Sequence, residues 1–188
     1  MIGYAFSGSY CTLAASLRSL EMLIAEGYDV LPILSDNVRN TDTRFFLASE
    51  FCSKVEKTCG RRPISTIAEA EPLGPKNPLD ALVVAPCTGN SLAKIANGIT
   101  DTPLTMAVKA HLRSDRPLLI ALASNDAMSQ NLSNLARLMT RRSVYFVPMV
   151  EDDPKGKPYS LVAKMSEIPT ALALALRGVQ MRPIFTEK

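Results

Sequence analysis

Short runs of small and β-branched apolar residues alternate along this chain with segments that show helical periodicity. The runs lie at residues 2–6, 30–34, 81–85, 118–123 and 144–147. Runs of this length without polar alternation are typical of strands buried on both faces, as in parallel sheets covered by helices. The alternation therefore predicts an α/β fold with a parallel sheet and helices on both of its faces.

Amphipathic segments between the runs predict the helices. They are expected over residues 13–26, from a cap at 41–43 through Phe45 and Phe46 to Gly60, over 92–97 and 105–113, from a cap at 124–126 through Met128 and Leu132 to Met139, and over 166–177. Residues 71–80 are expected to form an ordered loop and residues 151–157 a charged one. At 188 residues the chain predicts one domain, with residues 151–188 packed on it or on a partner.

Composition narrows the class of protein. A formal net charge of +3 without a long basic block argues against nucleic acid, and no run approaches the roughly 18 apolar residues of a membrane span. The cysteines form no CxxC pair and His111 is the only histidine, so no metal site is expected and the thiols should be free. We expect a cytoplasmic protein.

Polar loops follow the predicted strands directly. Ser7-Gly8-Ser9, Ser35, residues 86–91 and residues 124–128 each stand where a strand ends. Ligands of such sheets bind beyond the carboxyl ends of the strands, so these loops predict one shared crevice. Neither GxGxxG nor GxxxxGK[ST] occurs, which favours a mononucleotide over a dinucleotide.

The most distinctive motif is PCTGNSLAKIANGITD at residues 86–101. Locally, Pro86 should end a strand, Asn90 or Ser91 should cap a helix, and Gly98 should end it. Together with the other polar loops and the Asn125-x-x-Met128 pattern, the motif resembles the flavoprotein family of FMN-binding cysteine decarboxylases. Within it, TDTRF at residues 41–45, AEPLGPK at 70–76 and DDPKGKPYSLVAKM at 152–165 are similar to the second subunits of dipicolinate synthases from spore-forming bacteria.

The resemblance implies a single-domain, three-layer, Rossmann-like flavoprotein fold and an FMN site. It assigns Ser7, Gly8, Ser9 and Ser35 to the phosphate, Thr88, Asn90 and Ser91 to the ribityl chain and ring edge, and Ser124, Asn125 and Met128 to the isoalloxazine. Core packing is the alternative use of Met128.

The closer resemblance implies an activity during sporulation, in the mother cell. The protein would act with the first (A) subunit of dipicolinate synthase, which would bind NAD(P), and together they would oxidise a dihydro or hydroxytetrahydro dicarboxylate to dipicolinate. Arg39, Arg44 and Lys76 are our candidates for the substrate carboxylates, because guanidinium and ammonium groups pair with them, although each is also an ordinary solvated cation. Asn125 and Arg44 are the candidate catalytic residues. The apolar last helix suggests a homo-oligomer or a docking surface for the other subunit.

Two departures from the family pattern leave alternatives open. The decarboxylases carry a catalytic histidine after the second strand, where this chain has none, and a Pro-x-Met-Asn run where it has only Asn125. Decarboxylation of a cysteine-type substrate is therefore the second hypothesis. A non-catalytic scaffold on the same fold is the third.

Overall fold

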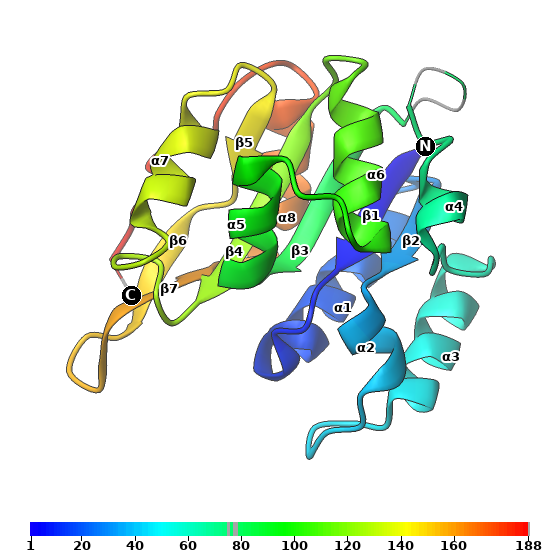
Figure 1. Cartoon of the computed structure of the whole chain (residues 1–188), viewed down its shortest axis with the longest axis horizontal. Coiled ribbons are helices and arrows are strands. Elements are labelled where there is room, and N and C mark those ends of the chain that lie inside the picture. Colours follow the sequence, from blue (N-terminus) through cyan, green and yellow to red (C-terminus); the bar gives the residue numbers. More distant parts are fainter. Residues whose placement is uncertain (75, 77–78, 188) are drawn as a thin grey trace.

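A parallel sheet forms the centre of the molecule in the computed structural model, which describes residues 1–74, 76 and 79–187 (Figure 1). Its parallel strands pair in the order β2–β1–β3–β4–β5. Their bounds are β1 Ile2–Phe6, β2 Val30–Leu34, β3 Ala81–Cys87, β4 Leu118–Ser124 and β5 Val144–Phe146. The strands predicted from the apolar runs all form, and the α/β fold class is confirmed.

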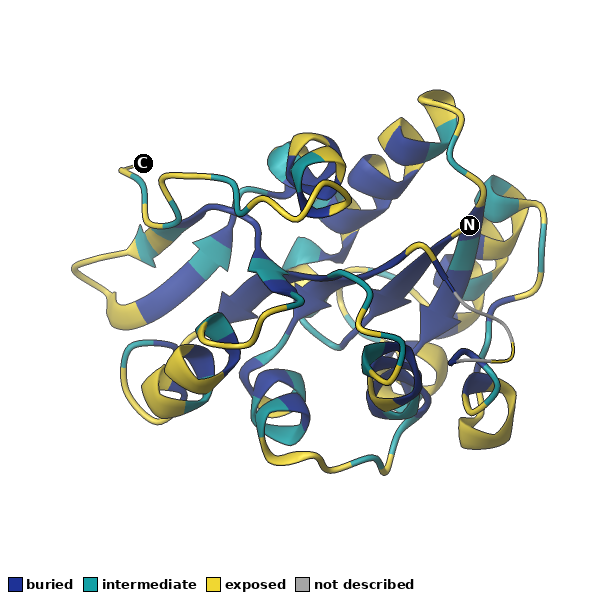
Figure 2. Cartoon of the chain, turned by 90° about the horizontal axis from the view of Figure 1, so that it is seen from above, coloured by how far each residue is buried: buried dark blue, intermediate teal, exposed yellow. Residues whose placement is uncertain are grey.

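Helices cover both faces of the sheet, and each buries an apolar side against it (Figure 2). One face carries α1 (Tyr10–Ala25), α3 (Ala48–Cys59) and α8 (Ile168–Ala175), and the other carries α4 (Ile67–Ala70), α5 (Gly89–Asn97), α6 (Pro103–Leu112) and α7 (Leu132–Met139). The short α2 (Asp36–Asn40) follows β2, and a 3-10 turn, η1 (Met165–Glu167), precedes α8.

The chain adds two more strands to the sheet after β5, which the sequence pattern predicted to be the last strand. The expected charged loop at residues 151–157 belongs to an antiparallel hairpin of β6 (Met149–Asp153) and β7 (Lys157–Ala163). The far end of β4 pairs with β7, Ala123 with Val162 and Ser124 with Leu161. Charged residues on the exposed side of β6 hid the strand pattern, and charges are common on edge strands because they discourage aggregation.

Several helix boundaries differ from the prediction because other groups cap the helices. α5 begins at Gly89 with Thr88 as its cap, ahead of Asn90 and Ser91. α3 begins only at Ala48, whose backbone N–H donates to Asp42 Oδ1 at 2.8 Å, so Phe45 and Phe46 stay in a loop.

After β4, residues 126–131 form turns, and α7 begins at Leu132, which is 51% exposed. Asp126 does not cap this helix because its carboxylate accepts hydrogen bonds from Ser124 and Asn131.

Two further segments were predicted only in part. Pro86 does not end β3, because the pairing of β3 with β4 is irregular between Val84 and Cys87 and the missing N–H is tolerated there. In the loop at 71–80, residues 75, 77 and 78 lie outside the described residues.

The apolar side of α8 packs largely inside the chain, since Ile168, Ala171 and Leu172 are buried in the core.

The order of the strands fixes where a ligand belongs. From β1 the chain crosses to β2 on one side, and β3 then lies on the other side of β1. Connections from β1 and β3 therefore diverge, and the crevice beyond their carboxyl ends is the switch point where such sheets bind ligands.

Candidate ligand-binding cleft

A cleft of about 730 Å³ lies at this switch point. Its volume is within the range of small-molecule sites, about 300–1,000 Å³. It is lined by the loops after β1, β3 and β4, by the segment before α3, and by the β6–β7 hairpin. The lining residues include Gly8, Ser9, Tyr10, Cys11, Thr12, Arg44, Phe45, Thr88, Gly89, Asn90, Ser124, Asn125, Asp126, Asp152 and Lys157.

In the loop after β1, Ser7 bonds to the protein and Ser9 faces the cleft. Ser7 is buried, and its hydroxyl donates to Pro86 O at 2.7 Å and accepts from the Thr88 N–H at 2.9 Å. These bonds tie the end of β1 to the end of β3. Ser9 lines the cleft, and its hydroxyl oxygen accepts from Thr12, which leaves its own proton available to a ligand.

The start of α1 is open to an anion. Ser9 occupies the cap position but makes no side-chain capping bond, and the first turn contains no acidic residue. Backbone N–H groups at a helix start carry partial positive charge, and unpaired ones attract phosphate. The described part of the chain thus provides a helix start, Gly8 and a free hydroxyl at one end of the cleft.

Ser35 is close to this end but does not line the cleft. It is 8% exposed, and its hydroxyl has no hydrogen-bond partner among the described residues. The start of α2, which follows Ser35, lies close to the β1 loop, because a Cβ placed on Gly8 would lie 3.3 Å from Asn37 Cβ. A buried, unpaired hydroxyl costs free energy unless a ligand or water satisfies it.

The start of α5, by contrast, is closed by its own residues. Thr88 Oγ1 accepts from the Ser91 N–H at 3.1 Å and donates to Ser91 Oγ at 3.0 Å. Ser91 is therefore occupied in capping and does not line the cleft, whereas Thr88 and the exposed Asn90 do.

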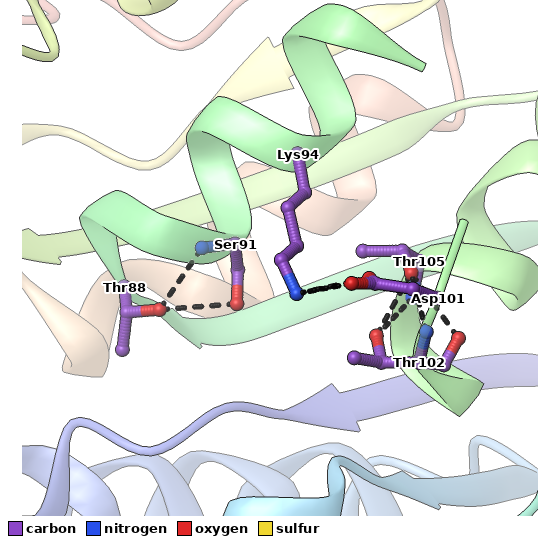
Figure 3. Close-up of polar contacts among 6 residues, drawn as sticks. All are labelled: Thr88, Ser91, Lys94, Asp101, Thr102 and Thr105. Carbon is purple, nitrogen blue, oxygen red and sulfur yellow. Dashed lines mark hydrogen bonds and ion pairs between the residues drawn. The ribbon is translucent and has the colours of Figure 1, made fainter. Parts of the chain in front are cut away.

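The second half of the 86–101 motif does not line the cleft. It joins α5 to α6 through polar contacts of its own (Figure 3). Lys94 Nζ contacts both carboxylate oxygens of Asp101, at 2.9 and 2.8 Å, and this hydrogen bond lowers the pKa of Asp101. Gly98 ends α5 with a left-handed φ of 72°, and Thr102 caps α6. The residues that make the motif distinctive are therefore largely structural.

The end of β4 supplies the opposite wall. Ser124, Asn125 and Asp126 line it, and Asp126, although it lies in the predicted loop at 124–128, was not among the assigned site residues. Met128 lies outside the cleft, with its backbone N–H donating to Tyr159 O at 3.0 Å and its side chain against the core, which is the packing alternative.

Charged and aromatic groups complete the cleft. Arg44 stands there beside Phe45, with its guanidinium 4.9 Å from the ring centre, and Lys157 pairs with Asp152 at 2.7 Å. The sequence pattern did not reveal Lys157, because its hairpin was not predicted. The aromatic side chains of Tyr10 and Phe45 were missed as well, although each adjoins a predicted site residue.

The structure does not bring Arg39 or Lys76 to the cleft. Arg39 donates to Ser65 Oγ at 3.3 Å, and the exposed Lys76 stands in the segment that leads to the amino end of β3. They were chosen because their charges suit substrate carboxylates, and charge alone does not indicate where a side chain lies.

Histidine chemistry is not supported in the cleft, and of the two loop cysteines, Cys11 and Cys87, only Cys11 lines it. His111, the only histidine of the sequence, is buried in α6, where Nε2 lies 2.9 Å from Pro117 O. Cys87 is buried, which raises the pKa of its thiol. All cysteines are free, and the described residues contain no group of His, Cys, Asp and Glu that could hold a metal.

Comparisons with known proteins agree with this geometry. The model of the family described as Flavoprotein matches residues 2–173. The chain is 45% identical over 186 residues to the B subunit of dipicolinate synthase from Bacillus subtilis (strain 168), covering 99% of this chain and 93% of that protein. It belongs to the flavoprotein family. Within this family it belongs with the B subunits of dipicolinate synthase, which confirms the resemblance.

Solved structures of the flavoprotein family share the fold. The crystal structure of the B subunit of dipicolinate synthase from Bacillus halodurans C superposes with a TM-score of 0.91 at 41% identity, over 100% of this chain and 96% of that one. An FMN-dependent cysteine decarboxylase superposes with a TM-score of 0.64 at 25% identity, over 93% and 95% of the two chains. No helix among the described residues of this flavoprotein is long and apolar enough to cross a membrane.

Proposed function

We propose that this chain is the flavin-binding subunit of a dipicolinate synthase, and that during sporulation it acts with a nicotinamide-dependent partner, the A subunit. One observation carries the proposal: the cleft lies at the switch point of the sheet and combines an open helix start with a separate polar wall. The 45% identity to the B subunit of a dipicolinate synthase supports the same assignment.

The residues of the cleft fit FMN. The phosphate would lie at the start of α1, between Gly8 and the hydroxyls of Ser9 and Ser35. The ribityl chain would run past Thr88 and Asn90, and the ring would face Ser124 and Asn125. Ser7, Ser91 and Met128 would support this site from behind, because their polar groups or side chains contact the protein itself.

The proposed reaction removes two electrons and two protons from a dihydro dicarboxylate and leaves an aromatic pyridine. Bound flavin supplies a two-electron carrier, and the nicotinamide on the partner supplies the final acceptor. Arg44 would bind a substrate carboxylate at the rim, and Asn125 would orient the ring being oxidised. Lys157 replaces Arg39 and Lys76 as the second cation for the substrate, because it lines the cleft.

The cysteine decarboxylase hypothesis is weaker. The family enzymes use a histidine after the second strand, and His111 lies in α6 on one face of the sheet, outside the residues that line the cleft. A scaffold without flavin remains a separate hypothesis, which a binding experiment tests directly.

Titration of the purified protein with FMN, followed by visible absorption, tests flavin binding. A shifted and structured flavin band supports the proposal, whereas an unshifted spectrum at saturating FMN favours the scaffold. The second step mixes the protein with its nicotinamide-dependent partner, the dicarboxylate and NAD(P)⁺, and follows the absorbance of dipicolinate.

Arg44→Ala should slow dipicolinate formation by raising KM for the dicarboxylate. Arg62→Ala is the matched control, because that guanidinium is 75% exposed and does not line the cleft. Equal rates for the two variants would remove Arg44 from the proposal. The same preparation, examined by sizing chromatography with and without the nicotinamide-dependent partner, tests the predicted homo-oligomer and the predicted complex.

A further inference from the structure

Ser124 presents an oxygen to the cleft but no proton. It is the last residue of β4, 8% exposed, and lines the cleft. Its hydroxyl donates a very short hydrogen bond to Asp126 Oδ1. A serine hydroxyl has one proton to donate, so the lone pairs that remain make Ser124 an acceptor only.

A chain of amides fixes Asp126 in this role. Asn131 Nδ2 donates to Asp126 Oδ2 at 2.9 Å, and Asn134 Nδ2 donates to Asn131 Oδ1 at 3.0 Å. Asn97 Nδ2 donates to Asn134 Oδ1 at 3.0 Å, and the guanidinium of Arg137 donates to Asn97 Oδ1 at 2.7 Å. The hydrogen bonds all run from a cation to an anion, so no single amide can reverse without losing both neighbours.

Gly89 packs against this cluster. A Cβ at this position would lie 2.4 Å from Ser124 Oγ, 2.6 Å from Asp126 Oδ1 and 2.7 Å from Asn131 Nδ2. The first turn of α5 therefore approaches the cluster by backbone alone, which keeps the Ser124–Asp126 pair at the wall of the cleft.

The charge of Asp126 indicates which part of a nucleotide lies here. Its carboxylate repels a phosphate, and the open start of α1 is two strand spacings away, about 10 Å. An uncharged ring suits the β4 end. The oxidised isoalloxazine ring contains one N–H group, at N3, and its other ring heteroatoms are acceptors that would meet the lone pairs of Ser124 unfavourably.

We infer that Ser124 accepts a hydrogen bond from the N3–H of the flavin ring, and that Asp126 is the positioning residue that keeps Ser124 in the acceptor state. This inference rests on the proposed flavin site. It assigns the imide edge of the ring to the end of β4, and it makes Asp126, which occupies an unspecified position of the Asn125-x-x-Met128 pattern, a determinant of specificity.

The test compares FMN with 3-methyl-FMN, in which a methyl group replaces the N3 proton. Affinities are measured by calorimetry, and the melting temperature of each variant is recorded to show that it folds. The unmodified protein should bind FMN at least about tenfold more tightly than 3-methyl-FMN, which corresponds to the loss of one hydrogen bond. Ser124→Ala should reduce this ratio severalfold.

Asp126→Asn is the sharper variant. Asn131 cannot reverse, so the new amide must turn its oxygen toward Asn131 and its NH₂ toward Ser124. Ser124 would then release its own proton into the cleft and become a donor. FMN binding should weaken by about tenfold while 3-methyl-FMN binding changes less. Asp29→Asn is the matched control, because Asp29 pairs with Arg61 outside the cleft and should keep the original ratio.

The outcomes separate the two proposals. Tight FMN binding without a methylation penalty, or with a penalty that persists in Asp126→Asn, would overturn the role of Ser124 and Asp126 and leave the flavin site standing. Absence of FMN binding in the unmodified protein would overturn both.

Discussion

The two edges of the parallel sheet that are formed by the amino and the carboxyl ends of its strands differ in how their polar groups are hydrogen-bonded. At the amino edge, Arg116 Nη1 donates to Leu79 O at 3.0 Å and to Asp80 Oδ1 at 3.3 Å, and His111 Nε2 is held by Pro117 O. At the carboxyl edge, the hydroxyl of Ser35 has no partner among the described residues and Ser9 leaves α1 uncapped. Among the described residues, the amino edge bonds its polar groups within the chain except at His111 Nδ1, which is buried without a partner. The carboxyl edge leaves groups in or beside the cleft, so stability and binding should respond to different substitutions.

Leu79→Ala should have the largest effect, and it should fall on stability alone. Leu79 is fully buried at the amino edge, where its Cδ1 would lie 2.6 Å from a Cβ on Gly3. Truncation should lower the free energy of unfolding by about 2–5 kcal/mol, measured by urea denaturation. Leu132→Ala, at an exposed position, should change it by less than about 0.5 kcal/mol. A change in FMN affinity of the folded Leu79→Ala protein would contradict the division of stability and binding between the two edges.

Ser7→Ala tests a residue at the carboxyl edge whose hydroxyl, unlike those of Ser9 and Ser35, is bonded at both donor and acceptor within the chain. The variant leaves the Thr88 N–H without its acceptor, so the free energy of unfolding should fall by about 1–3 kcal/mol. Ser49→Ala, exposed on α3, should show no such loss in the same denaturation series. Unchanged stability together with lost FMN binding would mean that Ser7 holds the phosphate, as the sequence predicted.

Ser9→Ala should lower FMN affinity and leave stability nearly unchanged. Ser9 makes no capping bond, and Thr12, which donates to its hydroxyl, can still donate to Ser9 O, so the melting temperature should change little. FMN affinity should fall by about tenfold through the loss of one charge-assisted hydrogen bond. Riboflavin, which lacks the phosphate, is the control ligand, and its affinity should not change. An equal loss for both ligands would place the phosphate elsewhere.

The last expected effect is a dependence of stability on pH at the amino edge. Burial lowers the pKa of His111 below its ordinary value near 6.5, and its Nδ1 has no partner among the described residues. The unfolded chain therefore takes up a proton first as the pH falls below about 6.5, so the free energy of unfolding should decrease there. His111→Gln should flatten this slope in denaturation between pH values of about 5.5 and 7.5, which bracket the ordinary histidine pKa. An unchanged slope would assign it to other groups.

The sequence predicted what depends on local pattern. Apolar runs defined the parallel strands, and the polar residues that follow them defined most of the cleft, because side chains at the ends of neighbouring parallel strands must meet. It did not indicate that Ser7 and Ser91, whose hydroxyls are in the expected loops, bond to the protein. Which way a hydroxyl points depends on partners brought together only by the fold.

Long-range partners explain the other misses. The role of Asp126 depends on Asn131 and on residues of α5 and α7, and no local motif marks such a network. The β6–β7 hairpin was missed because its first strand is charged and exposed on one side. The sequence did not indicate that Arg39, on α2, donates to Ser65.

The division of β4 between two ladders has a consequence for the order in which the protein is made. The first residues of β4 pair with β5, whereas Ala123 and Ser124 pair with β7, which is synthesised later. Asp152 and Lys157 of the hairpin line the cleft. When the nascent chain has emerged from the ribosome as far as Val147, it therefore contains the strands of the parallel sheet but not the whole cleft. Ligand binding should begin only after the hairpin has emerged, so the nascent chain should first be able to bind the proposed flavin during the final part of its synthesis.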